Sequence, residues 1–529
     1  MNFRIEFYLF FLFLWMSSIA QHDLGRKAVR YLAKNKTDIA VEIVNKEPKI
    51  KNSSINEAVR YFVLAMAECQ RDNVSVAYQY ARQAVALGLP FERFLAGPCD
   101  VFGPLYKYYE FKKCVKIQNM NLLHGPLLGS VTDTSASFWV RTVEEEEISI
   151  QISSMKGEKL TGKSLIGKGQ TKGNSDYTTI IVTGLKPDTK YQYTVLLGGK
   201  SIEQRNLFRT HPERGESTRF SIDFGGGAGV TPMNKNMWTN IAGYKPGAYM
   251  LLGDNVYFDD PFHPMTQRYC YYRRQSQPQW RSLVATTSVY TIYDDHDFGT
   301  NDCIPGAEIE NPKWKHEVVD VFKENWNNPS NGGGEENPGC WHEYYFGDVH
   351  SIMLDGIYYR ELDIGSMLGN FQKEWLFRVR VSSKAKFIVI ASPVPWSPGV
   401  KPGSKDTWDG FPKEREEIFS FLEEQQIEGV LLMSPDRHRS DLRKIERSNV
   451  YDLYEVMSSK LTNVHTHGLM ENAEGSEFII GYNDKCSFGL LDFNTKVMDP
   501  EVKYSIINID NKLIDSRIIK LSQLSHTKQ

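Results

Sequence analysis

Three apolar, strand-forming runs in the chain, MLLGDNVY, VYTIYDDHD and GVLLMSPDRH, each end abruptly in acidic or imidazole side chains. The residues at these ends are Asp254, Asp294, Asp295, His296, Asp436 and His438. Buried strands of open α/β sheets deliver such groups to their carboxyl ends, where these folds build their sites. Clustered carboxylates in a medium of low dielectric constant are costly unless cations neutralise them. The sequence therefore predicts a metal centre.

The order of the motifs resembles that of the PhoD-type alkaline phosphatases, a branch of the calcineurin-like metallophosphatase superfamily. The motifs run G-D-x-x-Y, then D-D-H-D with N-D, then D-R-H, and the resemblance covers residues 120 to 485. It extends to LGNFQKEWLFRVRVSSKAKFIVI and WDGFPKEREEIFSFL, which stand in the family's order. Any one motif is a weak signal, whereas the ordered set is strong.

The resemblance implies a set of metal ligands. Asp254 would bridge two cations, Tyr257 would ligate iron as a phenolate, and Asp295 would hold the second metal. Asp436 and His438 would add one ligand to each ion. Oxygen donors suit hard ions such as calcium, and a phenolate with an imidazole suits ferric iron. We therefore expect two or more metal ions, calcium and iron being the first candidates.

The same resemblance implies catalytic roles for residues beside the ligands. His296 would protonate the leaving-group oxygen or steady the transition state, and Asp297 would orient its imidazole. Basic side chains must also meet the phosphate, and Arg360 is the first candidate because it follows the strand SIMLDGIYYR. The other arginines considered for this role are Arg273, Arg274 and Arg437. For each single arginine, a solvated surface charge is the more frequent role.

The chain departs from the family pattern at two places. The family usually has a Cys ligand to iron after its first catalytic strand, where this chain has RFSIDFGGGAG. Asp223 is a substitute ligand there, and the glycines from Gly225 to Gly229 form either a phosphate-cradling turn or a merely tight one. The second departure is Ser434-Pro435, where the family often has Gly before Asp-Arg-His. Both changes bear on which metal binds more than on whether metal binds.

Other polar residues carry weaker signals. Asn301 and Asp302 are second candidates for ligands or for residues that support ligands. A structural role is the expectation for four histidines, although the pair in NVHTHG could reach the site from a loop. These histidines are His342, His350, His465 and His467.

Bulk properties limit the possible classes of protein. A chain of 529 residues is too long for one core and should hold about three or four domains. The net charge of −3, with both signs interspersed, gives no indication of a nucleic acid partner. Residues 1 to 20 read as a signal peptide, which predicts a secreted or periplasmic protein with no membrane span after cleavage. Seven cysteines leave at least one unpaired, and one bridge among Cys270, Cys303 and Cys340 is a possibility.

Periodicity divides the rest of the chain and predicts a multidomain protein of mixed α+β and α/β class. Residues 21 to 118 show helical spacing and read either as tetratricopeptide-like units or as a plain helical cap. Residues 119 to 213 alternate like a fibronectin type III-like β-sandwich, with Trp139 in its core and Tyr191 or Tyr193 as a corner tyrosine. Residues 214 to 529 would form a four-layer αββα metallophosphatase domain with C-terminal strands. The segment QRYCYYRRQSQPQW within it is consistent with a surface for a polar or anionic ligand.

The leading functional hypothesis is a secreted, metal-dependent phosphoesterase. It would hydrolyse phosphate monoesters, phosphodiesters or both by hydroxide that the metals activate. One alternative is a non-catalytic ligand-binding protein on a degenerate metallophosphatase fold, although the intact acidic and imidazole motifs argue against it. A second alternative is an interaction protein in which the helical N-terminal segment binds a protein partner and the phosphoesterase domain is accessory.

Overall fold

The computed structural model describes residues 25–46, 54–118, 120–157, 159–173, 176–448 and 450–526. The signal peptide predicted at residues 1–20 lies outside these ranges. Within them, no helix combines the length and the apolar character that crossing a membrane requires.

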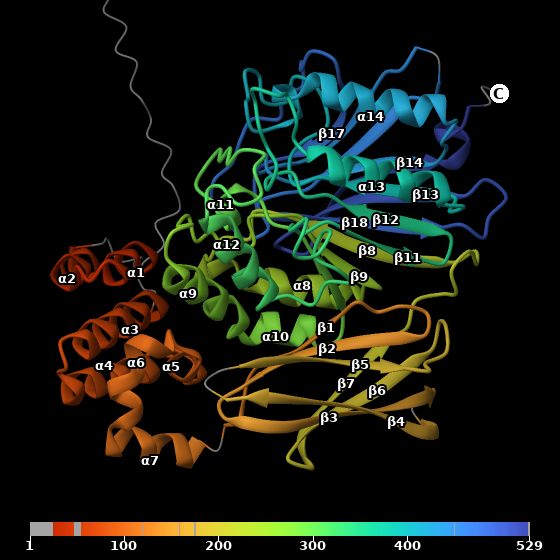
Figure 1. Ribbon diagram of the computed structural model, residues 1–529. Coiled ribbons are helices and arrows are strands. Elements are labelled where there is room, and N and C mark those ends of the chain that lie inside the picture. Colours follow the sequence, from red (N-terminus) through yellow and green to blue (C-terminus); the bar gives the residue numbers. More distant parts are fainter. Residues whose placement is uncertain are drawn as a thin grey trace, which may run out of the picture.

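The N-terminal part is helical throughout (Figure 1). Two pairs of contacting helices come first, and Phe62 of the second pair packs against Phe94 and Phe102 from the helices that follow. The predicted helical spacing is confirmed, because the alanines at 58, 65, 77, 81 and 84 are all buried. The helices are α1 (Arg26–Ala33), α2 (Thr37–Lys46), α3 (Ser54–Gln70), α4 (Val74–Ala86), α5 (Glu92–Ala96), α6 (Cys99–Lys107) and α7 (Tyr109–Gln118).

Seven strands follow and enclose a core of their own. They are β1 (Leu122–Gly129), β2 (Ser135–Thr142), β3 (Glu145–Lys156), β4 (Lys159–Lys172), β5 (Tyr177–Thr183), β6 (Lys190–Leu197) and β7 (Lys200–Arg209). Strands β4, β3, β6 and β7 form one antiparallel sheet opposite β1, β2 and β5. The Tyr191 hydroxyl accepts a hydrogen bond of 2.8 Å from the backbone N–H of Lys186, as a corner tyrosine does. Trp139 is fully buried, but it packs on the neighbouring catalytic core and donates to the carbonyl of Glu324.

Two larger sheets face each other in the rest of the molecule. The first has the order β20-β19-β18-β8-β9-β10-β1-β2-β5, so one side of the sandwich continues this larger sheet through β1 and β10. The second has the order β11-β12-β13-β14-β16-β15-β17. Their strands are β8 (Arg219–Gly225), β9 (Ala248–Leu251), β10 (Ser288–Thr291), β11 (His342–Phe346), β12 (Val349–Met353), β13 (Phe387–Ala391), β14 (Val430–Ser434), β15 (Ser440–Ile445), β16 (Leu453–Met457), β17 (Glu477–Tyr482), β18 (Ser487–Asn494), β19 (Glu501–Asn508) and β20 (Leu513–Lys520).

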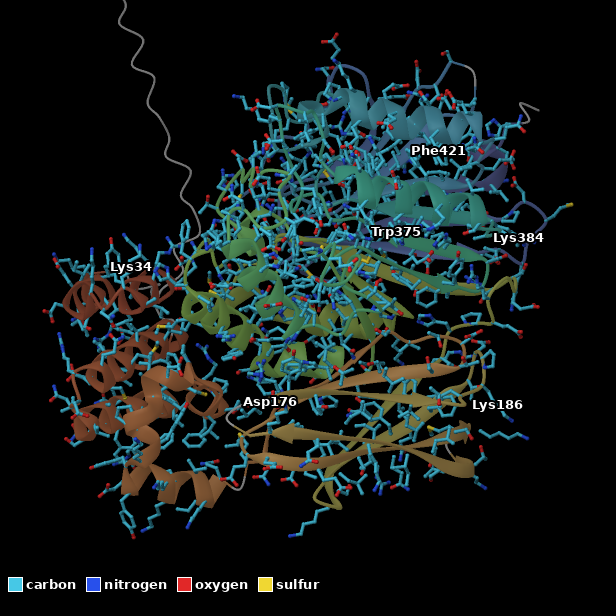
Figure 2. All side chains as sticks on the ribbon, viewed as in Figure 1. Lys34, Asp176, Lys186, Trp375, Lys384 and Phe421 are labelled. Carbon is cyan, nitrogen blue, oxygen red and sulfur yellow. The ribbon has the colours of Figure 1, made fainter. Side chains whose placement is uncertain are left out.

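Helices cover the outer faces of both sheets (Figure 1). Helices α13 (Gly369–Ser382) and α14 (Pro412–Glu424) lie outside the second sheet, and Figure 2 shows Trp375 and Phe421 on this outer layer. The first sheet is covered by α8 (Asn236–Tyr244), α9 (Pro264–Gln275) and α10 (Pro278–Val284). The short α11 (Asp295–Phe298) and α12 (Trp314–Lys323) complete the α-helices.

Two expectations from the sequence need correction. The Tyr- and Arg-rich segment after residue 263 is not a ligand-binding surface, because nearly all of α9 is buried between the N-terminal helices and the first sheet. None of the seven cysteines forms a disulfide, so no bridge links Cys270, Cys303 and Cys340.

Candidate metal centre

The predicted strands deliver their acidic residues to one edge of the molecule's core. Asp254 follows β9, Asp294 and Asp295 follow β10, and Asp436 follows β14. Strands β9 and β10 are parallel neighbours in the first sheet, whereas β14 lies in the middle of the parallel part of the second. The carboxyl ends of both sheets therefore contribute to one site, and the negative charge of Asp436 acts on Asp294 and Asp295.

Glycines allow the loops after these strands to approach closely. Gly253 has φ +123°, and a Cβ there would lie 2.6 Å from the Cβ of Asp294. A Cβ on Gly226 would lie 2.5 Å from the Cβ of Pro435 and 3.0 Å from the carbonyl oxygen of Gly253. The turn after β8 is thus wedged between the loops after β9 and β14, and only glycine fits there.

The first candidate metal group consists of Asp254, Asp295 and His296. Each offers a ligand atom within 4.8 Å of the others. Burial and the nearby carboxylates of Asp295 and Asp297 raise the pKa of Asp254 well above its usual value. Burial likewise raises the pKa of Asp294, together with the charges of Asp295 and Asp254. Carboxyl groups that resist ionisation for these reasons are stabilised by a bound cation.

Several buried polar atoms at the site make no hydrogen bond to the described residues. Asp294 Oδ1, Asp436 Oδ2 and His438 Nδ1 have no hydrogen bond. An orphaned buried acceptor costs free energy unless something satisfies it. Oxygen and imidazole donors of this kind fit metal ions, so the residues present match the metal centre that the sequence predicts.

Backbone strain concentrates at the same residues. Asp254, Tyr257, Asp436 and His438 have φ of +56°, +54°, +62° and +48°. Residues other than glycine enter this left-handed region at a cost and do so mainly where function requires it. Burial, together with the charge of Asp254, raises the pKa of Tyr257 well above its usual value, so these two side chains act on each other.

A second acidic group lies beside the first and already has a cation of the protein. Asp295, Asp302 and Asp406 offer ligand atoms within 4.8 Å of one another. The Lys401 ammonium lies 2.9 Å from Asp302 Oδ1 and 2.6 Å from Asp406 Oδ2. It also lowers the pKa of Asp436 against the effect of burial. Lys401 neutralises part of the negative charge of this second group. The second group therefore depends less on a bound metal ion than the first group does.

His296 is oriented by a different carboxylate from the one predicted. Its Nδ1 donates to Asp259, which leaves Nε2 as the other ring nitrogen for proton exchange. Burial lowers the pKa of His296, but Asp295, Asp254 and Asp259 outweigh that effect and raise it well above its usual value. The expectation that Asp297 orients the imidazole is therefore corrected.

Asp297 instead organises the loop that carries two predicted ligands. Its carboxylate accepts from the backbone N–H groups of Asn255, Val256 and Tyr257, the last two at 2.9 and 3.0 Å. These bonds hold the strained turn between Asp254 and Tyr257. The reason is geometric, because Asp297 sits at the end of the short α11 and faces this loop rather than the ring of His296.

Three histidines gather at the third motif. The ring centroid of His438 lies 5.2 Å from that of His465 and 5.6 Å from that of His467. Arg437 joins them, with Nη2 3.3 Å from Nδ1 of His467 and Nη1 3.6 Å from Asp436 Oδ2. The sequence predicts a structural role for His465 and His467 in the loop NVHTHG, with contact to the site as the less expected alternative. The structure places both rings beside His438.

Of the arginines considered for phosphate contact, Arg437 and Arg360 pair with carboxylates of the acidic cluster, Arg437 with Asp436 and Arg360 with Asp294. Arg360 is fully buried behind Asp294, and it donates from Nε to the carbonyl of Gly356 and from Nη1 to that of Cys303. Arg273 and Arg274 are buried on α9, where they lie over aromatic rings. Arg360 Nη2 lies 3.9 Å from Asp294 Oδ1, so this arginine belongs to the acidic cluster, and its contact with phosphate stays a prediction.

Asp223 lies away from both metal groups. It is fully buried in β8, where it is paired in register with Tyr249 and acts on the pKa of Tyr244 and Tyr249. Burial and Asp492 raise its pKa well above its usual value. The glycines that follow leave no room for a cysteine, because a Cβ on Gly225 would lie 2.8 Å from Leu461 and one on Gly227 would lie 3.0 Å from the backbone N of Lys460. The first strand has no cysteine to offer a thiolate, and neither metal group includes Asp223, whose role as a ligand stays a prediction.

Sequence reasoning missed several residues of the site. These are Asp259, Lys401 and Asp406 as site residues, and Asp294 as more than a neighbour of Asp295. Asp259 stands in the run FDDP and carried a signal that went unused, since it follows the G-D-x-x-Y motif by two residues. Lys401 and Asp406 lie in the loop GVKPGSKDTWDG, whose composition reads only as a turn-rich segment.

Comparison with known proteins finds similar families over two parts of the chain. A family model described as PhoD-like phosphatase matches residues 232–479, and one described as a domain of unknown function matches residues 119–214. Alkaline phosphatase D of Bacillus subtilis (strain 168) is 31% identical over 102 residues. That match covers 18% of this chain and only 17% of the relative's length.

Two solved structures share the fold. A structure of PhoD has a TM-score of 0.61 at 14% identity and covers 74% of this chain and 88% of its own. Purple acid phosphatase PPD1 from yellow lupin (Lupinus luteus) seeds has a TM-score of 0.57 at 13% identity and covers 75% of each chain. At such low identity the likeness shows a metallophosphatase fold and nothing finer.

Proposed function

We propose that this protein is a metal-dependent phosphoesterase that hydrolyses phosphate monoesters, phosphodiesters or both, because residues 232–479 match the family model of PhoD-like phosphatases. The observation that carries the proposal is the close group of Asp254, Asp295 and His296, whose carboxylate and imidazole atoms lie within 4.8 Å of one another. The two carboxylates would hold metal, and the imidazole beside them would serve in proton transfer. Further support comes from Asp436 and His438, whose buried Oδ2 and Nδ1 atoms make no hydrogen bond to the described residues.

The metal set in this proposal is Asp254, Tyr257, Asp295, Asp436 and His438. Bound metal ions would lower the pKa of water and offset the charge of the phosphate oxygens. The donors are mainly carboxylate oxygens, which supports calcium, while Tyr257 and His438 would suit iron. The strained backbone at four of these five residues supports a site whose geometry is fixed before metal binds.

Residues of the chain would perform the remaining steps. His296 would donate a proton to the leaving-group oxygen. Asp259 would hold the imidazole ring in its orientation through the hydrogen bond from Nδ1. Arg437 and Lys401 would bind the phosphate, since both carry positive charge beside Asp436. Asp297 would act indirectly by holding the loop of Asp254 and Tyr257.

The wider layout belongs to the same proposal. We take residues 119–213 as a fibronectin type III-like β-sandwich and residues 214–529 as a four-layer αββα domain. A protein that begins with the predicted signal peptide would act outside the cytoplasm, where calcium is available.

The first experiment measures metal content and turnover together. The protein is supplied in turn with calcium, iron, manganese and zinc, and hydrolysis of bis(p-nitrophenyl) phosphate and p-nitrophenyl phosphate is followed. Asp254→Asn should lose bound metal and at least about a hundredfold in kcat, because a charged carboxylate of the proposed metal set is removed. Asp223→Asn is the matched control, since it removes an equally buried carboxylate outside the metal groups and should keep both metal and turnover.

The outcomes separate the proposal from its rival. A folded protein that binds metal but shows no turnover with any metal would favour a non-catalytic ligand-binding protein on the same fold. Loss of metal in Asp223→Asn would return that residue to the ligand set. The ratio of diester to monoester turnover would then narrow the substrate class.

A further inference from the structure

The N-terminal helix α1 touches the loop that carries Tyr257 and Asp259. Arg26 Nη1 lies 2.5 Å from the carbonyl oxygen of Tyr257 and 2.5 Å from Asp259 Oδ2. One turn further along the helix, Arg30 Nη2 donates to the carbonyl oxygens of Phe258 and Asp259 at 3.2 and 2.7 Å. These contacts link residues more than 220 positions apart in the sequence.

The start of α1 is fixed by close packing. Gly25 has φ +111°, and a Cβ there would lie 2.5 Å from the Tyr269 hydroxyl and 2.9 Å from Val59. Only glycine allows this approach, so the helix begins at a defined point against α9 and α3. The apolar face of α1, with Ala28, Val29 and Leu32, is buried in the same core as the catalytic sheets. Figure 2 shows Lys34, which follows the last residue of α1, at the edge of this helical part.

Arg26 is thereby linked to His296, the proposed proton donor, through one intermediate residue, Asp259. Asp259 uses Oδ1 for Nδ1 of His296 and Oδ2 for Arg26, so the guanidinium and the imidazole hold the carboxylate from opposite oxygens. Asp259 also has φ +49°, a conformation that needs support from its surroundings. Arg26 supplies that support twice, at the carboxylate and at the carbonyl of Tyr257.

We propose that Arg26 is a positioning residue of the active site, and that α1 is a clamp that completes the site from outside the phosphatase domain. The inference rests on the proposed function, because positioning matters only if His296 moves a proton. It assigns the helical N-terminal segment a role in the reaction, in place of a docking role for another protein.

The decisive variant is Arg26→Gln, compared with Lys27→Gln on the same helix. Lys27 is exposed, so its variant makes the same change of charge without touching the loop. Arg26→Gln should lower kcat by about tenfold with KM nearly unchanged, because a misoriented general acid loses part of its contribution. Arg26→Lys should restore part of kcat, since an ammonium can still bind Asp259.

A double-mutant cycle with Asp259→Asn tests whether the two residues act as one unit. If Arg26 works through Asp259, the double variant should be no slower than Asp259→Asn alone. A merely structural role would make the two losses multiply. Equal kcat for Arg26→Gln and Lys27→Gln would overturn the positioning role while leaving the proposed function intact.

Hydrogen exchange gives a second measurement that does not depend on turnover. The amides of residues 257–260 should exchange faster in Arg26→Gln than in Lys27→Gln, because the loop loses its clamp. Unchanged exchange would refute the clamp even in an inactive protein. Absence of turnover in the wild-type protein with every metal would overturn the proposed function and, with it, the catalytic role of Arg26.

Discussion

Asp259 lies on the loop after β9, and Asp297 contacts that loop from α11, yet the two carboxylates bond different groups. Asp259 binds two cationic side chains, His296 and Arg26, whereas Asp297 binds three backbone N–H groups. A carboxylate that binds an imidazole governs its tautomer and orientation, while one that binds backbone donors governs the conformation of a loop. Substitution should therefore separate catalysis from stability at these two residues.

Asp259→Asn should lower kcat and change stability little, and Asp297→Asn should lower the free energy of unfolding by about 2 kcal/mol. The second value follows because an amide keeps one acceptor oxygen but loses the charge that strengthens bonds to N–H groups. Urea unfolding and steady-state kinetics on both variants measure the two effects. A stability loss at Asp259 as large as that at Asp297 would contradict the division of roles.

The turn after β8 shows how an element can exclude a ligand. Gly225, Gly226 and Gly227 pack against Leu461, Pro435 and the backbone of Lys460, so any side chain there must displace a neighbouring loop. The two departures from the family pattern, the missing cysteine and the presence of Pro435, are thus connected. The ring of Pro435 fills the space beside Gly226 that a side chain would need. The loops that carry Asp254 and Asp436 depend on that contact.

Gly226→Ala should destabilise the protein by about 2 kcal/mol, because the added methyl group overlaps Pro435 and the Gly253 carbonyl. It should also weaken metal retention, since both overlapped loops carry proposed ligands. Gly243→Ala is the matched control: it lies in α8 with nothing within 4 Å of its Cβ and should stabilise by about 0.5–1 kcal/mol. Thermal unfolding of the two variants checks the contrast, and equal effects would show that the turn has room.

At the scale of elements, much of the site could be predicted, because the end of a buried strand is marked in the sequence by an apolar run that gives way to polar residues. Asp254, Asp295 and Asp436 each stand just after an apolar run, and the chain order of those runs fixes which loops meet. Asp406 and Lys401 could not be found this way, because they lie on a long loop whose path depends on packing. Arg26 was beyond prediction for the same reason, since a helix more than 220 residues away docks on the site through tertiary contacts alone.

The described residues pack into two hydrophobic cores of unequal size. The N-terminal helices share one core with the catalytic sheets, while most of the sandwich residues pack in a core of their own. The sandwich is joined to the rest at His211, whose backbone N–H donates to Thr132 and whose ring stacks on Phe346 of β11 at 3.6 Å between centroids. His211 Nδ1 lies 3.0 Å from the carbonyl oxygen of Tyr345.

This joint should weaken in acid, because burial lowers the pKa of His211 to about 3 from an ordinary 6.5. The unfolded chain binds the proton first, so stability is lost as pH falls from 6.5 toward 3 and is fully present above that range. Two units below the unfolded value, at about pH 4.5, the loss from this residue is about 3 kcal/mol. The cause is physical: the protonated ring would carry a second N–H at Nε2, which is buried without a hydrogen-bond partner among the described residues.

His211→Gln isolates this contribution from those of other buried histidines, such as His342, whose pKa burial lowers to about 4. The amide keeps a donor for the Tyr345 carbonyl but cannot be protonated, so its free energy of unfolding should fall less steeply between pH 6.5 and pH 4.5 than that of the wild type. Urea unfolding at several pH values measures both slopes. Identical slopes would mean that the ring already finds an acceptor when protonated, and the joint between sandwich and catalytic sheets would then have to be held mainly by its apolar contacts.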